Sequence, residues 1–164
     1  MLFGGTGALA LRKLLPALFR LFVLGHFGSD SRLFAVACEP LSLCAYRDLV
    51  QEALRCVMPD QDPAQVRHFL NRVEYLMVDV DGESGWDSLA TALPEEPRLR
   101  VFYFATRAEL FGGLCERLAH FGLARPPSRL VLEKPIGGRQ SSAAALHGSV
   151  VSVFDESRIY RIDH

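Results

Sequence analysis

The sequence has little of what disulfide-rich, metal-binding or nucleic-acid-binding proteins require. Its 164 residues include four cysteines, Cys38, Cys44, Cys56 and Cys115, and none lies in a CxxC pair or at metal-ligand spacing. We therefore expect reduced thiols, no bound metal and a cytoplasmic location. Lys+Arg 18 against Asp+Glu 19 gives a net charge of -1, which excludes a strongly basic face for nucleic acid. The sequence also contains no internal repeat and no low-complexity stretch.

An apolar stretch near the start of the chain is the candidate for a signal peptide or a membrane span. It reads LALRKLLPALFRLFVLG, residues 9–25, and is interrupted by Arg12, Lys13 and Arg20. No uncharged run reaches the ~18 residues that a bilayer-crossing helix needs. The stretch therefore predicts an amphipathic helix with a mostly buried face, and we expect no targeting segment and no membrane partner.

Strand-like and helix-like segments alternate along the chain. Strands are expected at 1–3, 33–38, 74–80, 100–106, 129–134 and 158–163, and helices at 8–24, 42–57, from 62 onward, 85–93, 108–122 and 141–154. Six strands separated by helices predict an α/β fold, with a doubly wound, mostly parallel six-stranded sheet and helices on both faces. A hydrophobic content of 49% suits such a sheet, or a surface meant for another domain.

Three residues predict where helices begin or end. Ser42 suits an N-cap, and Pro63 suits the first turn of a helix, where its missing N–H is not needed. Gly122 suits the left-handed position that follows a helix. The first strand, MLF, has three residues where about five are typical, so we expect it to be clipped.

A glycine-rich turn, GGTGALA at residues 4–10, follows the first strand. It contains Gly5-x-Gly7-x-x-Ala10, a variant of the dinucleotide-binding fingerprint of Rossmann folds. The fingerprint uses the first glycine for a tight turn and the second for close approach of a pyrophosphate to the backbone, with the following helix supplying partial positive charge. A nucleotide site is the hypothesis, and a purely structural turn is the alternative.

The same fingerprint predicts that a side chain at the end of the second strand selects the coenzyme. A carboxylate there accepts a hydrogen bond from a free ribose 2′-hydroxyl, whereas an arginine holds a 2′-phosphate. The residues at this position are Cys38 and Glu39. Glu39 favours NAD, and the alternative is a solvated loop glutamate.

Several stretches resemble the glucose-6-phosphate dehydrogenase family. FGGTGALALRKLLPAL, residues 3–18, is similar to the family's N-terminal coenzyme motif, GxxGDLAxRKLxPA. LVLEKPIG at 130–137 resembles its EKP motif, and VFDESRIYRIDH at 153–164 resembles the start of its RIDHYLGKE substrate motif. RVFYFATRAELFGGLCERLAHFGL at 100–123 resembles the family's fourth strand and helix. Order, spacing and strand placement agree across essentially the whole chain.

The resemblance implies an NAD(P)-binding Rossmann domain over residues 1–164 with NADP as its coenzyme. Cys38 stands where the family usually has the arginine that grips the 2′-phosphate, a loss expected to cost roughly 1.5–3 kcal/mol, and Glu39 would repel that phosphate. The chain is therefore expected to discriminate against NADP more than its relatives do, with NAD as the alternative coenzyme. The residues that match those approaching the coenzyme phosphates are Gly4, Gly5, Thr6 and Gly7.

Three further residues match substrate-site positions of the family. Lys134 matches the EKP lysine, which lies between coenzyme and sugar and binds glucose 6-phosphate, and whose bond to Pro135 is characteristically cis. His164 matches the histidine that holds the sugar phosphate. Asp163 matches the aspartate that orients the catalytic histidine and stabilises its protonated form.

In the family, the chain continues into a large α+β domain that carries the catalytic base, most sugar contacts and the dimer interface. We expect residues 1–164 to lack that domain and to be inactive alone in the oxidation of glucose 6-phosphate to 6-phosphogluconolactone, a reaction of the pentose phosphate pathway. Whether the chain acts as an enzyme at all therefore stays open.

Two alternatives remain. The first is a truncated, non-catalytic paralogue or split-enzyme fragment that a complementing polypeptide completes. The second is a sugar dehydrogenase of the glucose–fructose oxidoreductase type, which shares a Rossmann domain and an EKP turn. The RIDH ending and the RKLLPAL helix argue against the second.

Overall fold

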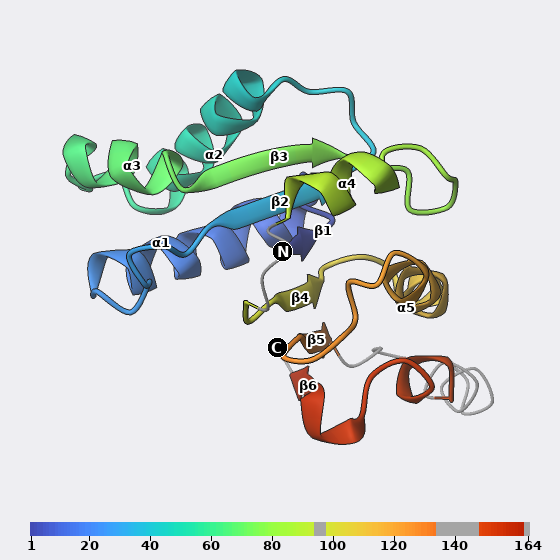
Figure 1. The fold of residues 1–164 in the computed structure, drawn as a ribbon. Coiled ribbons are helices and arrows are strands. Elements are labelled where there is room, and N and C mark those ends of the chain that lie inside the picture. The colour runs from blue at the N-terminus through green and yellow to red at the C-terminus, as the bar shows by residue number, and fades with distance from the viewer. Residues whose placement is uncertain (94–97, 134–147, 163–164) are drawn as a thin grey trace. The chain divides into compact units, whose positions relative to one another are not determined.

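The computed structural model describes residues 1–93, 98–133 and 148–162 (Figure 1). The chain divides into two compact units, an N-terminal unit of Leu2–Met77 and a C-terminal unit of Met1 with Val78–His164. Each unit contains three parallel strands together with helices, so the predicted α/β class with six strands is confirmed.

The strands of the N-terminal unit lie in the order β3-β2-β1. They are β1 (Leu2–Phe3), β2 (Leu33–Ala37) and β3 (Val73–Met77). Phe3 pairs with Val36, and Val36 pairs with Leu76 on its other side. Both residues of β1 and four of the five residues of β2 are buried. β1 and β2 are apolar at successive positions, without strict alternation, because both faces of these strands are buried.

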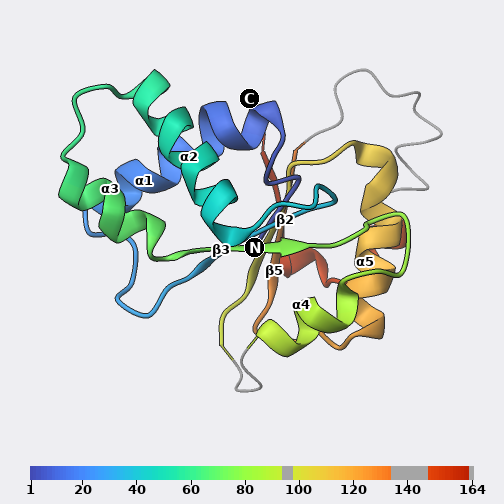
Figure 2. The same cartoon turned by 90° about the horizontal axis from the view of Figure 1, so that it is seen from above.

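The helices of this unit are α1 (Leu15–Val23), α2 (Leu43–Val57) and α3 (Pro63–Leu70). The predicted caps are present, since Ser42 Oγ accepts a hydrogen bond of 3.1 Å from the Ala45 amide and Pro63 occupies the first turn of α3. Asp62 Oδ1 also caps α3, by accepting 2.9 Å from the Ala64 amide. In Figure 2, α1 and α2 lie against the same face of the unit's sheet.

The first helix departs from its expected form. A continuous α-helix was expected over 8–24, but residues Ala10–Leu14 form a π-helical segment in which the Leu15 amide donates to the Ala10 carbonyl oxygen. Pro16 follows directly. A proline ring inside an α-helix clashes with the carbonyl four residues earlier, and a widened turn relieves that clash. Pro16 therefore explains the departure. The wider turn starts at Ala10, the third residue of the helical stretch that begins at Ala8.

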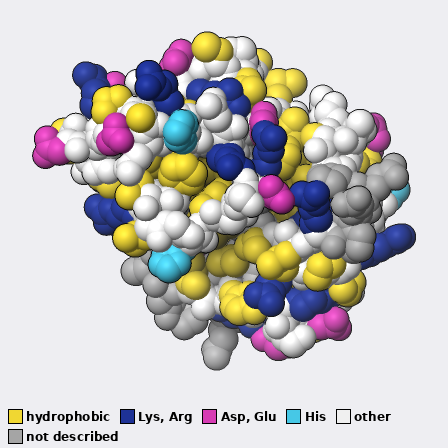
Figure 3. Space-filling model, turned by 60° about the vertical axis from the view of Figure 1, so that its left-hand side comes forward, with side chains coloured by type: hydrophobic (Ala, Val, Ile, Leu, Met, Phe, Trp, Pro, Cys, Tyr) yellow, Lys and Arg dark blue, Asp and Glu magenta, His cyan; other side chains and the backbone are white. Residues whose placement is uncertain are grey.

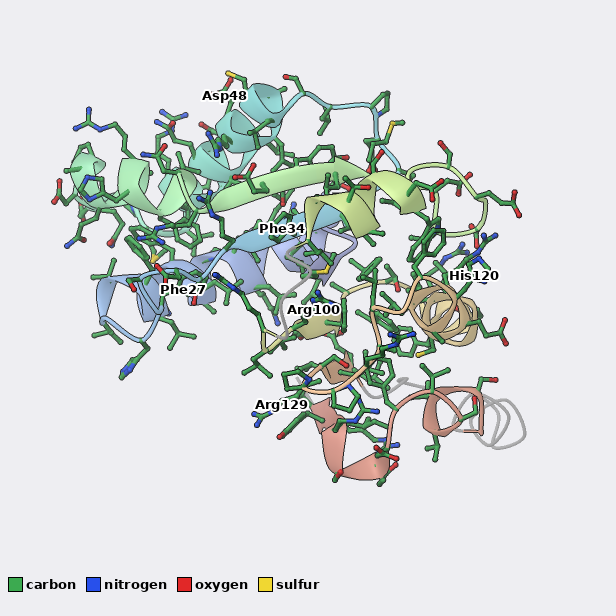
Figure 4. The ribbon with its side chains drawn as sticks, viewed as in Figure 1. Phe27, Phe34, Asp48, Arg100, His120 and Arg129 are labelled. Carbon is green, nitrogen blue, oxygen red and sulfur yellow. The ribbon has the colours of Figure 1, made fainter. Side chains whose placement is uncertain are left out.

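An aromatic cluster holds α1 to α3. Phe69 of α3 meets Phe19 and Phe22 of α1 edge-on, with ring centroids 5.4 and 5.6 Å apart. Phe27, labelled in Figure 4, closes the cluster against Phe22 and Phe69 at 6.3 and 6.4 Å. Edge-to-face pairs of this kind add to the free energy of burying their area.

The C-terminal unit has strands in the order β4-β5-β6. They are β4 (Val101–Phe104), β5 (Arg129–Glu133) and β6 (Ile159–Ile162). Its helices are α4 (Trp86–Ala92) and α5 (Phe111–His120), with short 3₁₀ segments η2 (Ala108–Leu110) and η3 (Glu156–Arg158). Gly122 has the predicted left-handed conformation after α5, with φ of 67°. Of the helix predicted at 141–154, residues 148–151 are helical and 141–147 lie outside the described residues.

Polar contacts fix the loops of this unit. The Asp79 amide donates to the Ser84 carbonyl oxygen, which turns the chain away and ends β3 earlier than the predicted residue 80. Arg158 NH1 donates to the Ala124 carbonyl oxygen at 2.9 Å and to Ser128 Oγ at 3.2 Å. Arg129, labelled in Figure 4, lies over the Tyr160 ring with its guanidinium carbon 5.8 Å from the ring centroid.

The surface carries both signs of charge. On the face in Figure 3, Lys and Arg side chains are interspersed with Asp and Glu. None of the helices in the described ranges combines the length and the apolar composition of a bilayer-spanning segment. No group of three or more His, Cys, Asp or Glu within the same residues has the arrangement of a metal site.

Candidate functional site

The glycine turn leads directly from β1 into the first helix. Gly4 has a φ of 80°, in the left-handed region that favours glycine. The Gly7 amide donates to the Gly4 carbonyl oxygen at 2.9 Å, which closes the turn, and the Leu11 amide donates to the Gly7 carbonyl oxygen at 3.0 Å, which starts the helix. Gly7 is therefore the residue at which the turn becomes helix.

The glycine amides are used inside the protein. Those of Gly4 and Gly5 both donate to the Val36 carbonyl oxygen on β2, at 2.9 and 3.1 Å. Between Gly4 and Leu9, the amides that have no hydrogen-bond partner among the described residues are those of Thr6, Ala8 and Leu9. The first N–H groups of a helix have no partner within it and attract anions. The donors open to a phosphate are therefore these three amides, while the glycines shape the turn that presents them.

Gly5 and Gly7 are glycines for different reasons. A Cβ added at Gly5 would lie 2.8 Å from Ala35 Cβ and 3.2 Å from the Tyr46 hydroxyl, so Gly5 lets the turn pack against β2 and α2. A Cβ added at Gly7 would meet the Gly4 carbonyl oxygen at 3.1 Å and no other described atom within 4 Å. The space over Gly7 is otherwise open. Free amides beside an open glycine fit a pyrophosphate, as the fingerprint requires.

Glu39 lies where the predicted coenzyme-selecting residue should lie, just beyond the end of β2. Its carboxylate Oε2 accepts a hydrogen bond of 2.8 Å from Thr6 Oγ1, which brings the selecting position to the glycine turn. Glu39 and its neighbour Cys38 are both exposed, and the Cys38 thiol is free. The structure therefore brings three predicted residues, Thr6, Cys38 and Glu39, to one corner of the N-terminal unit.

Two tyrosines of this site were missed by the sequence reasoning. The Tyr46 hydroxyl, on α2, donates to the Gly5 carbonyl oxygen at 2.8 Å, and the Tyr75 hydroxyl, on β3, donates to the Glu39 carbonyl oxygen at 2.6 Å. The rings stack on each other with centroids 4.6 Å apart. The available signal was the spacing of Tyr46, Val50 and Leu54 along one buried face of α2, but it indicates burial and not a contact with the turn.

Burial governs the ionisation of both hydroxyls. Desolvation, with a contribution from Tyr75, raises the pKa of Tyr46 well above its ordinary value. Desolvation, together with Glu39 and Cys38 nearby, raises the pKa of Tyr75 to about 12. Both side chains are therefore protonated hydrogen-bond donors throughout the neutral range.

The predicted substrate-site residues Lys134, Asp163 and His164, and the bond from Lys134 to Pro135, lie outside the described residues. The residues that precede them in sequence are described. Glu133 and Ile162 are register partners at the ends of the parallel strands β5 and β6. Glu133 Oε1 also accepts a hydrogen bond of 3.0 Å from the Tyr103 hydroxyl of β4.

Comparison with known proteins identifies the family of this chain. The family described as "Glucose-6-phosphate dehydrogenase, NAD binding domain" matches residues 1–164. Glucose-6-phosphate 1-dehydrogenase of Gluconobacter oxydans is 40% identical over 169 aligned residues, and that of Dickeya dadantii is 36% identical over 165. Both alignments cover the whole of this chain but 35% and 34% of the relatives, so the chain spans about a third of their length.

Solved structures agree with this match. Glucose-6-phosphate 1-dehydrogenase of Mycobacterium avium superposes with a TM-score of 0.87 at 28% identity, over 98% of this chain and 35% of that one. A glucose-6-phosphate dehydrogenase in complex with its substrate glucose-6-phosphate superposes with a TM-score of 0.88 at 29% identity, over 99% of this chain and 35% of that one. The fold of the described residues is therefore that of the NAD binding domain named in the family match.

Proposed function

The chain belongs to the glucose-6-phosphate dehydrogenase family, and we propose that its glycine turn and Glu39 bind a nicotinamide dinucleotide with a preference for NAD. The amides of Thr6, Ala8 and Leu9 would receive the pyrophosphate at the start of the helix. The Glu39 carboxylate would accept a hydrogen bond from the ribose 2′-hydroxyl.

The preference for NAD rests on the contact between Thr6 and Glu39. The hydrogen bond of 2.8 Å holds a carboxylate beside the turn, at the corner that a 2′-phosphate would have to enter. Two anions at close range repel each other. The neighbouring Cys38 supplies no positive charge, and a charge-assisted bond to phosphate is worth roughly 1.5–3 kcal/mol. This contact is the single observation that carries the proposal.

A bound nicotinamide would accept a hydride, in the family's reaction from C1 of glucose 6-phosphate. We propose that Lys134 and His164 bind that sugar phosphate and that Asp163 orients the catalytic histidine, as the motif resemblance indicates. Hydride transfer also needs a base for the C1 hydroxyl, and none of residues 1–164 is assigned to that role. The polypeptide of residues 1–164 alone is therefore expected to bind coenzyme without turning over glucose 6-phosphate.

Calorimetric titration of the purified chain with NAD and with NADP tests the proposal. We expect NAD to bind more tightly than NADP. The Cys38→Arg variant should bind NADP about ten- to a hundredfold more tightly than the parent chain, because it restores a charge-assisted contact. Cys38→Lys is the matched control, since it adds the same charge without the planar fork of arginine, and it should recover only part of the gain.

Tighter binding of NADP than of NAD by the parent chain would contradict the preference, and binding of neither would contradict the proposed site. Substrate-dependent formation of NADH or NADPH by the purified chain, followed by absorbance, would contradict the expected lack of turnover.

A further inference from the structure

We infer that the Tyr46 hydroxyl is the positioning group that aims the Thr6 amide at the coenzyme phosphate, an inference that rests on the proposed function. Tyr46 is fully buried on α2 and lies 41 residues from the turn in sequence. Its hydroxyl donates to the Gly5 carbonyl oxygen at 2.8 Å.

The Gly5 carbonyl and the Thr6 N–H belong to one planar trans peptide group, so they point in opposite directions. A hydrogen bond that fixes the carbonyl therefore fixes the amide as well. Because the carbonyl points at Tyr46, the Thr6 N–H points away from it. That amide has no partner among the described residues, which leaves it available to a ligand.

This peptide group needs an external restraint. Gly4 and Gly5 adopt many backbone conformations, so the peptide that follows them can rotate at little cost. The Gly5 amide is held by the Val36 carbonyl oxygen at 3.1 Å, which restrains the preceding peptide group but not the next one. The Tyr46 hydroxyl restrains the next one. Since burial raises the pKa of Tyr46, the hydroxyl remains a donor at neutral pH.

The stack of Tyr46 on Tyr75 extends this restraint to the ribose end of the site. Tyr75 lies 4.6 Å away, ring centroid to ring centroid, and its hydroxyl donates to the Glu39 carbonyl oxygen. The residue after Glu39 is Pro40, which has no N–H, so fixing the Glu39 carbonyl does not orient a donor for the ligand. The two tyrosines therefore have separate tasks: Tyr46 orients a phosphate donor, and Tyr75 holds the backbone of the residue that selects the coenzyme.

The test compares Tyr46→Phe with Tyr75→Phe in the ¹⁵N-labelled chain. Each variant keeps the stacked ring and loses one buried hydroxyl, so the two are matched. NAD and ADP are the ligands, with dissociation constants from calorimetry and amide signals from NMR. Tyr46→Phe should weaken the binding of NAD and of ADP by the same factor. That factor should be about two- to tenfold, which is the range for one net hydrogen bond. It should also shift the Thr6 amide signal of the free chain and reduce the further shift that ADP causes.

Tyr75→Phe should leave the Thr6 amide signal of the free chain in place. It should instead lower the ratio of the affinity for NAD to the affinity for NADP. Unchanged ligand affinity and an unchanged Thr6 signal in folded Tyr46→Phe would overturn the inference, even if that variant unfolds at a lower temperature. If Tyr46→Phe does not fold, hydrogen exchange of the Thr6 amide in the parent chain is measured with and without NAD. NAD must slow this exchange, and an unaltered rate overturns the inference. Failure of the parent chain to bind either dinucleotide is a different result, which refutes the proposed function itself.

Discussion

Thr6 Oγ1 donates a hydrogen bond of 2.8 Å to Oε2 of Glu39, although the two residues are 33 positions apart. Thr6 belongs to the turn after β1, and Glu39 follows β2. The carboxyl ends of neighbouring parallel strands meet at one edge of a sheet, which is where ligands bind in open α/β folds. The contact therefore joins the predicted phosphate-binding turn to the predicted coenzyme-selecting residue.

Replacing Thr6 tests whether this hydrogen bond orients the carboxylate. Thr6→Val keeps the shape of the side chain and removes its hydroxyl. The Glu39 carboxylate is then no longer held in one orientation for the ribose 2′-hydroxyl. We expect NAD affinity to fall about two- to tenfold, the range for one net hydrogen bond. Thr6→Ser keeps the donor and should bind NAD like the parent chain. Equal NAD affinities for the serine and valine variants, measured by calorimetry, would speak against an orienting role.

Two glycine-to-alanine substitutions should have opposite effects on stability. Gly5→Ala places a Cβ 2.8 Å from Ala35 Cβ, so the turn or β2 must move, and we expect a loss of about 1–3 kcal/mol in the free energy of unfolding. Gly113→Ala, inside α5, meets no described atom within 4 Å and should gain about 0.5–1 kcal/mol. Urea denaturation followed by circular dichroism measures both. A Gly5→Ala variant as stable as the parent chain would contradict this prediction, because it would mean that the turn accommodates the added Cβ.

The four thiols should differ in reactivity. Cys38, Cys44 and Cys56 are exposed, whereas Cys115 is buried in α5. Burial, with a contribution from Glu116, raises the pKa of Cys115 to about 12. The reactive thiolate of Cys115 therefore forms only near that pH, far above pH 8. At pH 8, a colorimetric disulfide reagent should titrate three thiols in the folded chain and four in urea.

Cys115→Ala serves as the control for this assignment, because its folded and urea-treated forms should both titrate three thiols. Rapid reaction of all four thiols in the folded parent chain would mean that α5 opens readily in solution.

Arg158 and Arg161 provide a matched pair of arginines. The Arg158 side chain is 17% exposed and binds the Ala124 carbonyl oxygen, Ser128 Oγ and the Ser128 carbonyl oxygen. Arg158→Met leaves these acceptors without their charged donor, at an expected cost of about 1.5–3 kcal/mol. Arg161 pairs with Glu156, whose side chain is 58% exposed, so Arg161→Met should cost at most about 1 kcal/mol. Similar urea midpoints for the two variants would contradict this difference.

Local signals in the sequence predicted local structure well. Ser42 caps α2, Pro63 begins α3 and Gly122 follows α5 in the left-handed conformation, as expected. Each of these features depends on a hydrogen bond or a dihedral angle within a few residues of the one that signals it. The π-helical segment Ala10–Leu14 was not predicted, because a proline within a helical pattern indicates a disturbance without saying how the backbone absorbs it.

The candidate site was predicted in part. The glycine fingerprint located the turn, and strand order placed Glu39 at its side. The prediction that the glycines approach a phosphate stays a prediction, and the structure adds that the Gly4 and Gly5 amides donate to the Val36 carbonyl oxygen. That acceptor lies 31 or more residues further along the chain, and no local pattern specifies it. Lys134, Asp163 and His164 stay predictions, since they lie outside the described residues.

The amino-acid sequence by itself determined the α/β class, the turn 4–7 and the family, because periodicity, glycine content and motif spacing are properties of the chain order. Only the tertiary structure decided which groups meet: the Tyr46 hydroxyl with the Gly5 carbonyl, and the Thr6 hydroxyl with the Glu39 carboxylate. Those contacts depend on how α2 and the parallel strands pack in three dimensions. Packing brings together groups that are 33 and 41 residues apart, a distance over which sequence spacing carries no information on contact.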